Sequence, residues 1–357
     1  MAITKSYWKN RKVLVTGHTG FKGSWLTLIL KTLGAEIYGL ALENNSPYSL
    51  YQSVNVANRV TREYFADIRD SEVLGKYINE INPEVIFHLA AESLVLNSFS
   101  DPIKTFQVNI LGTFNVLCAA TQPSNNPIVI VVTSDKCYRN DRVGIPFKES
   151  DPLGGGDPYS ASKACAEIVS SSFQYSFGES RQMKIATVRA GNVIGGGDWS
   201  ENRLIPDFFK SVLKSEPLIV RSPKSTRPWQ HVLEPLIGYM SAVEYMDSLP
   251  ATNMNSWNFG PDNESIVSVE NILRRFNDLH PTTQVLIGNE IQSKEAIELR
   301  LDSSLAKNQL GWKPLLDINT SVSITSEWYS QFFAGENMQK ITEMQIKRYL
   351  DLVIKND

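Results

Sequence analysis

The stretch KVLVTGHTGFKG, residues 12–23, decides the fold of this chain. Its first five residues are mostly apolar and β-branched, which predicts a strand at Lys12–Thr16. Gly17, Gly20 and Gly23 follow, and residues 22–33 have a helical pattern. Glycines between a strand and a helix let the backbone approach a pyrophosphate and present amide groups at the positive end of the helix. A glycine-rich turn without a ligand is the alternative, but the strand before it and the helix after it favour dinucleotide binding.

Further strands are expected at residues 35–40, 85–89 and 128–133, with helical patterns between them. The last two runs are nearly all apolar, as in strands that are covered on both faces. Strands and helices that alternate in this way form right-handed βαβ units around a parallel sheet. The sequence therefore predicts an α/β fold, a Rossmann-type doubly wound parallel sheet.

A second, smaller mixed α/β lobe that binds substrate is expected after Arg189, where Gly, Pro and Trp cluster at 195–199 and 222–229. A helix at 232–246 and a strand at 257–259 are expected to return to the first domain. Residues 1–188 plus about 232–262 are thus assigned to a dinucleotide-binding domain. Residues of about 189–231 plus 263–340 form the substrate lobe, and 341–357 form a C-terminal helix or tail.

Charge and composition exclude several classes of protein. The formal net charge is -3 and the signs are mixed along all 357 residues, so neither nucleic acid nor an anionic membrane is an expected partner. No apolar run resembles a signal peptide or a membrane span, which predicts a cytoplasmic protein. Cys118, Cys137 and Cys165 lack the spacing of a disulfide framework or zinc site and are expected to be free thiols, with no metal site.

The dinucleotide is expected to be NAD rather than NADP. Residues 35–58 contain no Lys or Arg that would neutralise a 2′-phosphate. Glu43 is the nearest acidic candidate for the adenosine ribose, although it lies somewhat far along the second strand. Asp67 and Ile68 follow the third strand and would meet the adenine; a helix cap is the alternative for Asp67.

Catalysis is predicted for two groups of residues. Tyr159 and Lys163 are four apart at the start of a helix, so both side chains project from one face, and the ammonium is expected to lower the pKa of the phenol. Ser134, Asp135 and Lys136 follow an apolar strand, at the sheet edge where such folds place their chemistry. Ser134 would hydrogen-bond the substrate hydroxyl, and an acid beside an amine suits an elimination. A turn-capping Asp and a solvated Lys are the alternative.

These motifs resemble the extended short-chain dehydrogenase/reductase family. The resemblance includes the glycine loop, His88 to Ser93, Ser134 to Lys136, Tyr159 with Lys163, and Arg189 to Val193. Longer strings, at 17–25, 133–138, 192–199 and 227–232, are similar to the family of CDP-glucose 4,6-dehydratases.

The resemblance implies an NAD-dependent lyase that acts on a nucleotide-sugar, with CDP-glucose favoured. Carbon 4 is oxidised by Tyr159 with Lys163, water is lost across carbons 5 and 6 with Asp135 as acid and Lys136 as base, and hydride returns to carbon 6. The implied cofactor contacts are Gly17, Thr19, Gly20, Phe21, Lys22, Gly23, Asp67, Ile68, Leu89, Ala90, Ala91, Asn109, Thr133, Tyr159 and Lys163. The implied substrate contacts are Glu92, Ser134, Asn192, Arg203, Leu204, Arg227 and Glu234. The alternative for Arg227 is a surface charge, and the resemblance implies that Asn109 fixes active-site backbone or water.

Some residues depart from the CDP-glucose pattern. That family usually has Gln-Pro where this chain has Glu92-Ser93, an Arg and a Tyr at Leu96 and Phe99, and a histidine-rich segment near 292–296. An epimerase of the same fold is the leading alternative function, and an NAD-sensing module without catalysis is a remote one. Helices expected at 103–120 and 159–177 carry apolar residues on more than one side, which predicts a homodimer through them.

Overall fold

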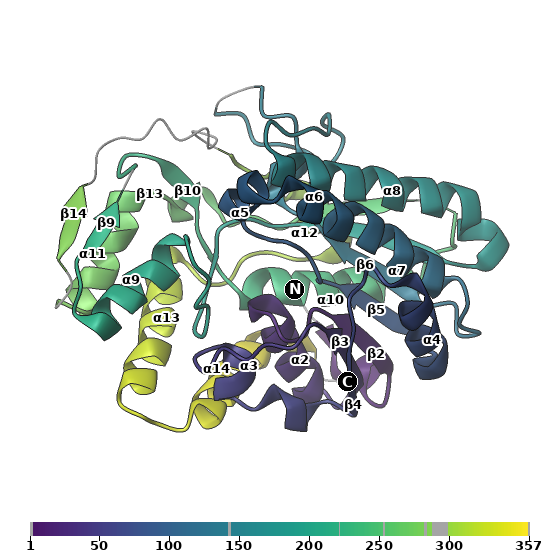
Figure 1. Cartoon of the computed structure of the whole chain (residues 1–357), viewed down its shortest axis with the longest axis horizontal. Helices are drawn as coiled ribbons and strands as arrows, with labels where there is room; N and C mark the ends of the chain where they lie inside the picture. Colours follow the sequence, from purple (N-terminus) through teal and green to yellow (C-terminus); the bar gives the residue numbers. More distant parts are fainter. Residues whose placement is uncertain are drawn as a thin grey trace.

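One parallel sheet of seven strands forms the centre of the chain (Figure 1). The computed structural model describes residues 3–141, 144–220, 222–252, 254–281, 284–287 and 299–355. The strand order is β12-β7-β6-β5-β2-β3-β4. Their bounds are β2 Lys12–Thr16, β3 Glu36–Ala41, β4 Arg62–Phe65, β5 Val85–His88, β6 Ile128–Val132, β7 Lys184–Arg189 and β12 Asn255–Asn258. The order reverses between β2 and β5, as in a doubly wound Rossmann fold, so the predicted fold class is confirmed.

Helices cover both faces of the sheet. One face packs against α2 (Phe21–Thr32), α10 (Leu233–Asp247) and α14 (Met338–Val353). The other face packs against α4 (Ser71–Ile81), α7 (Thr113–Ala120) and α8 (Pro158–Arg181). Helix α8 begins where Asp157 accepts a hydrogen bond from the backbone amide of Ser160 and Pro158 occupies the first turn. This cap places Tyr159 at the carboxyl edge of the sheet.

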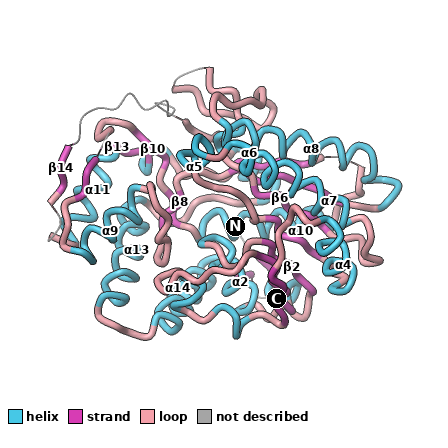
Figure 2. Tube along the Cα trace, in the orientation of Figure 1, coloured by secondary structure: helices cyan, strands magenta, loops and turns pink. Residues whose placement is uncertain are grey.

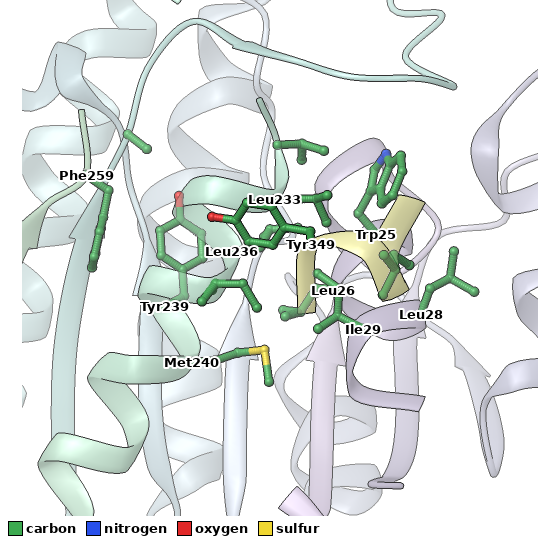
Figure 3. Packing of buried hydrophobic residues seen from close by; sticks show 14 of the residues in the cluster. Trp25, Leu26, Leu28, Ile29, Leu233, Leu236, Tyr239, Met240, Phe259 and Tyr349 are labelled. Atoms are coloured by element: carbon green, nitrogen blue, oxygen red, sulfur yellow. The ribbon is translucent and has the colours of Figure 1, made fainter. Parts of the chain in front are cut away.

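The core beneath the glycine loop is built from three helices that are distant in sequence (Figure 3). Its labelled members are Trp25, Leu26, Leu28 and Ile29 from α2, Leu233, Leu236, Tyr239 and Met240 from α10, Phe259, and Tyr349 from α14. All are buried. Close packing of this kind fixes the distance between the glycine loop and α10.

The sequence predicted one helix over residues 103–120, but the structure shows that this segment is not a single regular α-helix. It consists of α6 (Pro102–Phe106), a π-helical stretch at Gln107–Gly112, and α7. Such wide turns are frequent at functional sites. Asn109 lies in this stretch and is buried. The expected helix at 159–177 is longer, since α8 extends to Arg181.

The remaining strands form short pairs beside the main sheet (Figure 2). Parallel pairs join β8 (Val193–Ile194) to β11 (Gln230–His231) and β9 (Leu218–Val220) to β14 (Val285–Ile287). An antiparallel pair joins β10 (Thr226–Pro228) to β13 (Ile266–Ser268). The helices of this part are α9 (Leu204–Lys214), α11 (Val269–Leu279), α12 (Ser304–Leu310) and α13 (Ile318–Phe333). The segment 292–296, where the sequence departs from the CDP-glucose pattern, lies outside the described residues.

The two ends of the described chain lie together. Strand β1 (Ile3–Thr4), which precedes α1 (Lys5–Trp8), pairs in parallel with β15 (Ile354–Lys355). Helix α14 begins at Met338 rather than at 341 and packs against α2. The remaining short helices are α3 (Leu50–Ser53) and α5 (Val95–Ser100). Within the part of the chain that the structure describes, none of the helices combines the length and apolar character that a membrane span needs.

Candidate active site

A cavity of about 1030 Å³ opens at the carboxyl ends of β2, β5, β6 and β7. It brings together most residues that the sequence singled out. The predicted residues in its lining are Gly17, Thr19, Gly20, Phe21, Lys22, Gly23, Asp67, Ile68, Leu89, Ala90, Ala91, Glu92, Thr133, Ser134, Asp135, Lys136, Tyr159, Lys163, Asn192, Arg203, Leu204 and Arg227. Asn109 and Glu234 are not in the lining.

The glycine positions of the loop leave no room for a side chain. Gly17 has φ +74°, and a Cβ atom there would lie 2.8 Å from the backbone nitrogen of Ala90. A Cβ atom on Gly23 would lie 2.1 Å from the carbonyl oxygen of Gly17. The loop is therefore pressed against the turn after β5 and against the first turn of α2, which leaves a backbone cradle suited to a pyrophosphate.

Glu43 does not reach the cavity, so the candidate for the ribose was wrong. Strand β3 ends at Ala41, and Glu43 is exposed beyond it, whereas Leu42 lines the cavity. Asp67 does line the cavity, and its carboxylate accepts hydrogen bonds from Arg69 at 2.6–3.1 Å. The Arg69 side chain lowers the pKa of Asp67. Asp67 therefore presents an ion pair, not a free acid, at this end of the cavity.

Four of the side chains for which the sequence predicts a role in catalysis lie in this cavity. Ser134, Asp135, Tyr159 and Lys163 are all buried, and all line it. The Ser134 hydroxyl donates to Asp135 Oδ1 at 2.9 Å. Lys163 Nζ donates to the carbonyl oxygen of Val132, at the end of β6, at 3.1 Å. Lys136 also lines the cavity and is partly buried.

The pKa of Tyr159 is raised, not lowered as the sequence predicted. Burial raises it to about 12, although a hydrogen bond with Ser134 acts in the opposite direction. Burial also lowers the pKa of Lys163 to about 8. The prediction failed because spacing in a sequence shows which groups are neighbours but not how far each is removed from water.

Gly191 closes the cavity behind Asp135. A Cβ atom on Gly191 would lie 2.0 Å from Asp135 Oδ2 and 2.3 Å from its Cγ. The backbone after β7 therefore packs directly on this carboxyl group and limits where it can move. The next residue, Asn192, adopts a left-handed φ of +49°, which Asn tolerates better than most residues.

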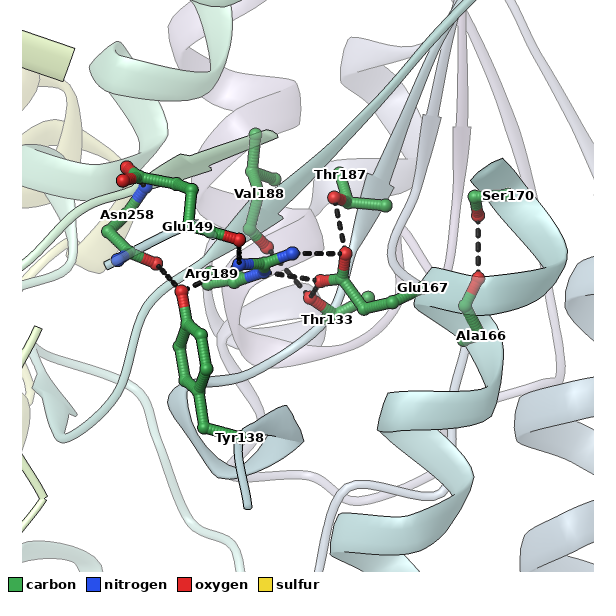
Figure 4. A network of polar contacts seen from close by, with 10 residues as sticks. All are labelled: Thr133, Tyr138, Glu149, Ala166, Glu167, Ser170, Thr187, Val188, Arg189 and Asn258. Atoms are coloured by element: carbon green, nitrogen blue, oxygen red, sulfur yellow. Dashed lines mark hydrogen bonds and ion pairs between the residues drawn. The ribbon is translucent and has the colours of Figure 1, made fainter. Parts of the chain in front are cut away.

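A buried polar network fixes the strands behind Ser134, Tyr159 and Lys163 (Figure 4). Glu167 lies one helical turn beyond Lys163 and accepts hydrogen bonds from Thr133 and from Thr187 Oγ1, the latter at 2.6 Å. Arg189 donates to both of its carboxylate oxygens at 2.8 Å. Sequence analysis missed Glu167, yet its position four residues after Lys163 was a usable signal.

The same network continues toward β12. Arg189 Nη1 donates to the Tyr138 hydroxyl at 2.6 Å, and that hydroxyl donates to Asn258 Oδ1 at 2.7 Å. Asn258 Nδ2 donates to the carbonyl oxygen of Phe147 at 2.8 Å. The loop that follows Lys136 is thus held to the sheet by buried hydrogen bonds.

Asn109 acts through the loop that carries Glu92. Its Oδ1 accepts from the amide of Glu92 and its Nδ2 donates to the carbonyl oxygen of Glu92, each at 2.9 Å. Asn109 thus holds the backbone of Glu92 in place and lies outside the cavity lining, and its contact with a cofactor stays a prediction. The Glu92 carboxylate forms an ion pair with Lys104 at 2.6 Å.

Arg203 spans the cavity. Its Nη1 lies 3.1 Å from Asp198 Oδ2, and its Nη2 donates to Ser93 Oγ at 3.3 Å. Asp198 also accepts hydrogen bonds from the backbone and side chain of Ser200. Arg203 is therefore held by Asp198 on one side of the cavity and by Ser93 on the other. Arg227 lines the cavity from β10.

Glu234 does not shape the nucleotide pocket, and that prediction was wrong. Its Oε1 accepts from the backbone amides of Leu315 and Leu316 at 2.9 and 2.7 Å, and it is fully buried beneath them. Burial raises the pKa of Glu234 to about 7. Its place near the start of α10 anchors the segment between α12 and α13.

No group of three or more His, Cys, Asp or Glu among the described residues could hold a metal ion.

A glycine cradle, a Tyr/Lys pair and a Ser at the carboxyl edge of a Rossmann sheet are the features of an extended short-chain dehydrogenase/reductase. The GDP-mannose 4,6 dehydratase family model matches residues 14–325, and the chain belongs to this family. It is 41% identical over 354 residues to the CDP-glucose 4,6-dehydratase of Salmonella typhimurium, with 98% of each chain covered.

Two further proteins are similar to this chain at lower identity. A probable dTDP-glucose 4,6-dehydratase of Sinorhizobium fredii is 26% identical over 340 residues, which cover 89% of this chain and 92% of the relative. The UDP-glucose 4-epimerase of Stenotrophomonas maltophila, solved with NAD and formylated UDP-arabinopyranose, superposes with a TM-score of 0.79 at 20% identity. That comparison covers 91% of this chain and 99% of the epimerase.

Proposed function

We propose that this chain is an NAD-dependent hydro-lyase that converts CDP-D-glucose into its 4-keto-6-deoxy derivative. The observation that supports it most strongly is the presence of Tyr159 with Lys163 and of Asp135 with Lys136 in one cavity. The first pair suits oxidation, and the second supplies an acid and a base for loss of water. The 41% identity to a CDP-glucose 4,6-dehydratase supports the choice of nucleotide and sugar.

The glycine cradle fits NAD. A Cβ atom on Gly17 or Gly23 would collide with backbone, so the loop presents main-chain amides rather than side chains to a pyrophosphate. Leu42 and Asp67 line the adenosine end, and Asp67 is paired with the guanidinium of Arg69. Bound NAD supplies a reversible hydride acceptor beside the sugar.

Tyr159 begins the reaction by accepting the proton of the 4-hydroxyl. Ser134 lies beside it and orients the same hydroxyl, since its own proton is donated to Asp135 and its lone pairs remain available. Lys163 holds a fixed position through the Val132 carbonyl oxygen. Its ammonium favours the charged phenolate form of Tyr159, which is the form that can accept this proton.

The resulting 4-ketone acidifies the proton on carbon 5. Lys136 removes that proton, and Asp135 protonates the departing 6-hydroxyl, so one molecule of water is released and a double bond joins carbons 5 and 6. Lys136 then returns a proton to carbon 5 while the hydride returns from bound NAD to carbon 6. The proton that Tyr159 accepted passes to Asp135, so all these side chains end as they began. The sum is loss of water with no net oxidation.

An epimerase needs Tyr159 and Lys163 but no acid and base at carbons 5 and 6. The proposal is tested by incubating the enzyme with CDP-, UDP-, dTDP- and GDP-glucose in deuterated water. A product lighter by one water and carrying deuterium at carbon 5, formed fastest from CDP-glucose, supports the dehydratase. A product of unchanged mass with an inverted hydroxyl would overturn it in favour of the epimerase.

We also infer that residues 1–188 plus about 232–262 bind NAD and that 189–231 plus 263–340 bind the nucleotide-sugar. In support, α10 and β12 pack with the main sheet, whereas β8, β9, β10, β11, β13 and β14 form separate pairs. The cavity has lining residues from both parts.

A homodimer through residues 103–120 and 159–177 completes the proposal. Large apolar side chains are exposed on these segments, including Ile103 at 70%, Leu111 at 54%, Ile168 at 57% and Tyr175 at 93%. Apolar patches of this kind mark interfaces between proteins. Light scattering after size exclusion is expected to give twice the chain mass for the wild type and the mass of one chain for Ile168→Asp. A wild type that is already monomeric, with the same mass as Ile168→Asp, would contradict the dimer.

A further inference from the structure

Lys22 belongs to the glycine loop that is proposed to bind the cofactor. The face of α2 that carries Lys22 is directed toward the segment after β8, on the other side of the cavity. Lys22 lies in the first turn of α2, and Trp25 is three residues further on the same face. Trp25 Nε1 donates to the carbonyl oxygen of Gly196 at 3.1 Å. A Cβ atom on Gly195 would lie 3.2 Å from the ring of Phe21. The start of α2 therefore packs on the segment after β8.

That segment leads to the residues predicted to bind the substrate. Residues 195–198 follow β8, and Arg203 precedes α9. Both Lys22 and Arg203 line the cavity. The Lys22 ammonium also lies 6.0 Å from the ring centroid of Tyr239, a residue of α10. Lys22 thus stands where the cofactor cradle, α10 and the substrate wall meet.

The charged groups that face Lys22 leave it without an acidic partner. They are Arg203, Asp135, Lys163 and Asp198, of which two are cations. Asp198 is bound to Arg203 and Ser200, and Asp135 accepts from Ser134. Within the described residues, no hydrogen bond or ion pair joins a carboxylate to the Lys22 ammonium. A partly buried cation that lacks an acidic partner is stabilised when an anion binds beside it.

We propose that the Lys22 ammonium binds the diphosphate of the nucleotide-sugar. One loop then serves both ligands, with its backbone holding the pyrophosphate of the cofactor and its side chain holding the diphosphate of the substrate. The inference builds on the function proposed above and assigns Lys22 a second role. A point charge on a flexible stem suits a diphosphate that lies between two fixed arginines, Arg203 and Arg227.

The charge of Lys22 makes this binding dependent on pH. Burial, with a further effect of Arg203, lowers the pKa of Lys22 to about 8. The ammonium is present below that pH and is lost above it, so the affinity for a diphosphate falls as pH rises through 8. Lys163 titrates in the same range, but it remains in every variant compared below.

The test is calorimetric titration of CDP into the NAD-loaded enzyme and its Lys22→Met, Lys22→Arg and Lys31→Met variants. Lys31 is an exposed lysine on the same helix and serves as the matched control. Lys22→Met is expected to weaken CDP binding about tenfold to a hundredfold, because a hydrogen bond to a charged group is lost. Lys22→Arg should recover part of the affinity, and Lys31→Met should match the wild type.

The NAD content of each preparation is measured after denaturation and restored with excess NAD. If Lys22→Met binds CDP as tightly as the wild type once NAD is restored, Lys22 serves only the cofactor and the inference is overturned. A fall in affinity above pH 8 that is as steep in Lys22→Met as in the wild type also overturns it, since Lys163 is present in both. If the wild type binds none of CDP, UDP, dTDP and GDP, the proposed function itself fails. If CDP binds but Lys22→Met does not weaken it, only the present inference fails.

Discussion

Removing the charge of Glu167 is expected to destabilise the fold without touching the cavity surface. Glu167 and Arg189 form an ion pair at 2.8 Å, with side chains only 3% and 4% exposed. Glu167→Gln keeps the volume and the acceptor that faces Thr187, but it leaves the guanidinium of Arg189 buried without a counter-charge. The position is shown in Figure 4.

The size of the effect follows from this burial. Deleting one partner of a buried ion pair costs roughly 3–5 kcal/mol. Arg189 retains the Tyr138 hydroxyl at 2.6 Å and the Glu149 carbonyl oxygen at 3.2 Å as acceptors. Because these contacts keep part of the guanidinium satisfied, the loss should fall near the lower limit, about 3 kcal/mol.

Urea unfolding followed by circular dichroism measures this loss. The matched control is Glu179→Gln, an exposed position on the same helix α8, where the change should stay within about 0.5 kcal/mol. If the two variants unfold at the same urea concentration, the buried network does not stabilise the fold and the reasoning fails.

Four further predictions concern the cavity and the core. Tyr159→Phe should abolish oxidation at carbon 4, seen as no reduced NAD on addition of substrate; normal turnover would contradict the assignment of the base. Asp135→Asn should still form reduced NAD with CDP-glucose but accumulate the 4-keto sugar that has not lost water; unimpaired dehydration would exclude it as the acid. Gly191→Ala should displace the Asp135 carboxyl group and slow dehydration about 100-fold, whereas Gly156→Ala, whose Cβ would meet nothing within 4 Å, should have no effect. Burial raises the pKa of Glu234 from 4.5 to about 7, so the stability that its protonated form provides is present below pH 4.5 and is lost as pH rises toward 7. Glu234→Gln should remove this loss of about 3 kcal/mol between pH 4.5 and 8, as measured by urea unfolding, and an unchanged pH profile would refute the burial argument.

The sheet was predictable because its signals are local. Lys12–Thr16 is a strand with the predicted bounds, and Gly17 and Gly23 after it stand where a Cβ atom would collide with backbone. The residues at 134–136 fell in the cavity because the ends of parallel strands meet at one edge. A strand, the turn after it and the helix that follows are each encoded by consecutive residues, so the sequence alone is enough to predict them.

The predictions about site residues were wrong where segments distant in the sequence determine the position or burial of a side chain. Glu43 could not be placed because the sequence does not show where β3 ends relative to the cavity. Glu234 was misassigned because its partners, Leu315 and Leu316, are some 80 residues away. The direction of the Tyr159 pKa was wrong because burial by the whole fold outweighs one neighbouring charge. The π-helical stretch around Asn109 has no local signal that distinguishes it from an α-helix.

The central claim is that hydride leaves carbon 4 and returns to carbon 6 of the same sugar. CDP-glucose labelled with deuterium at carbon 4 tests this most directly, with the product analysed by nuclear magnetic resonance. The proposed function predicts a 4-keto-6-deoxy sugar that carries the deuterium on carbon 6, with no accumulation of reduced NAD. Deuterium that remains on carbon 4 of an epimerised sugar, or that is lost to reduced NAD in solution, would contradict it.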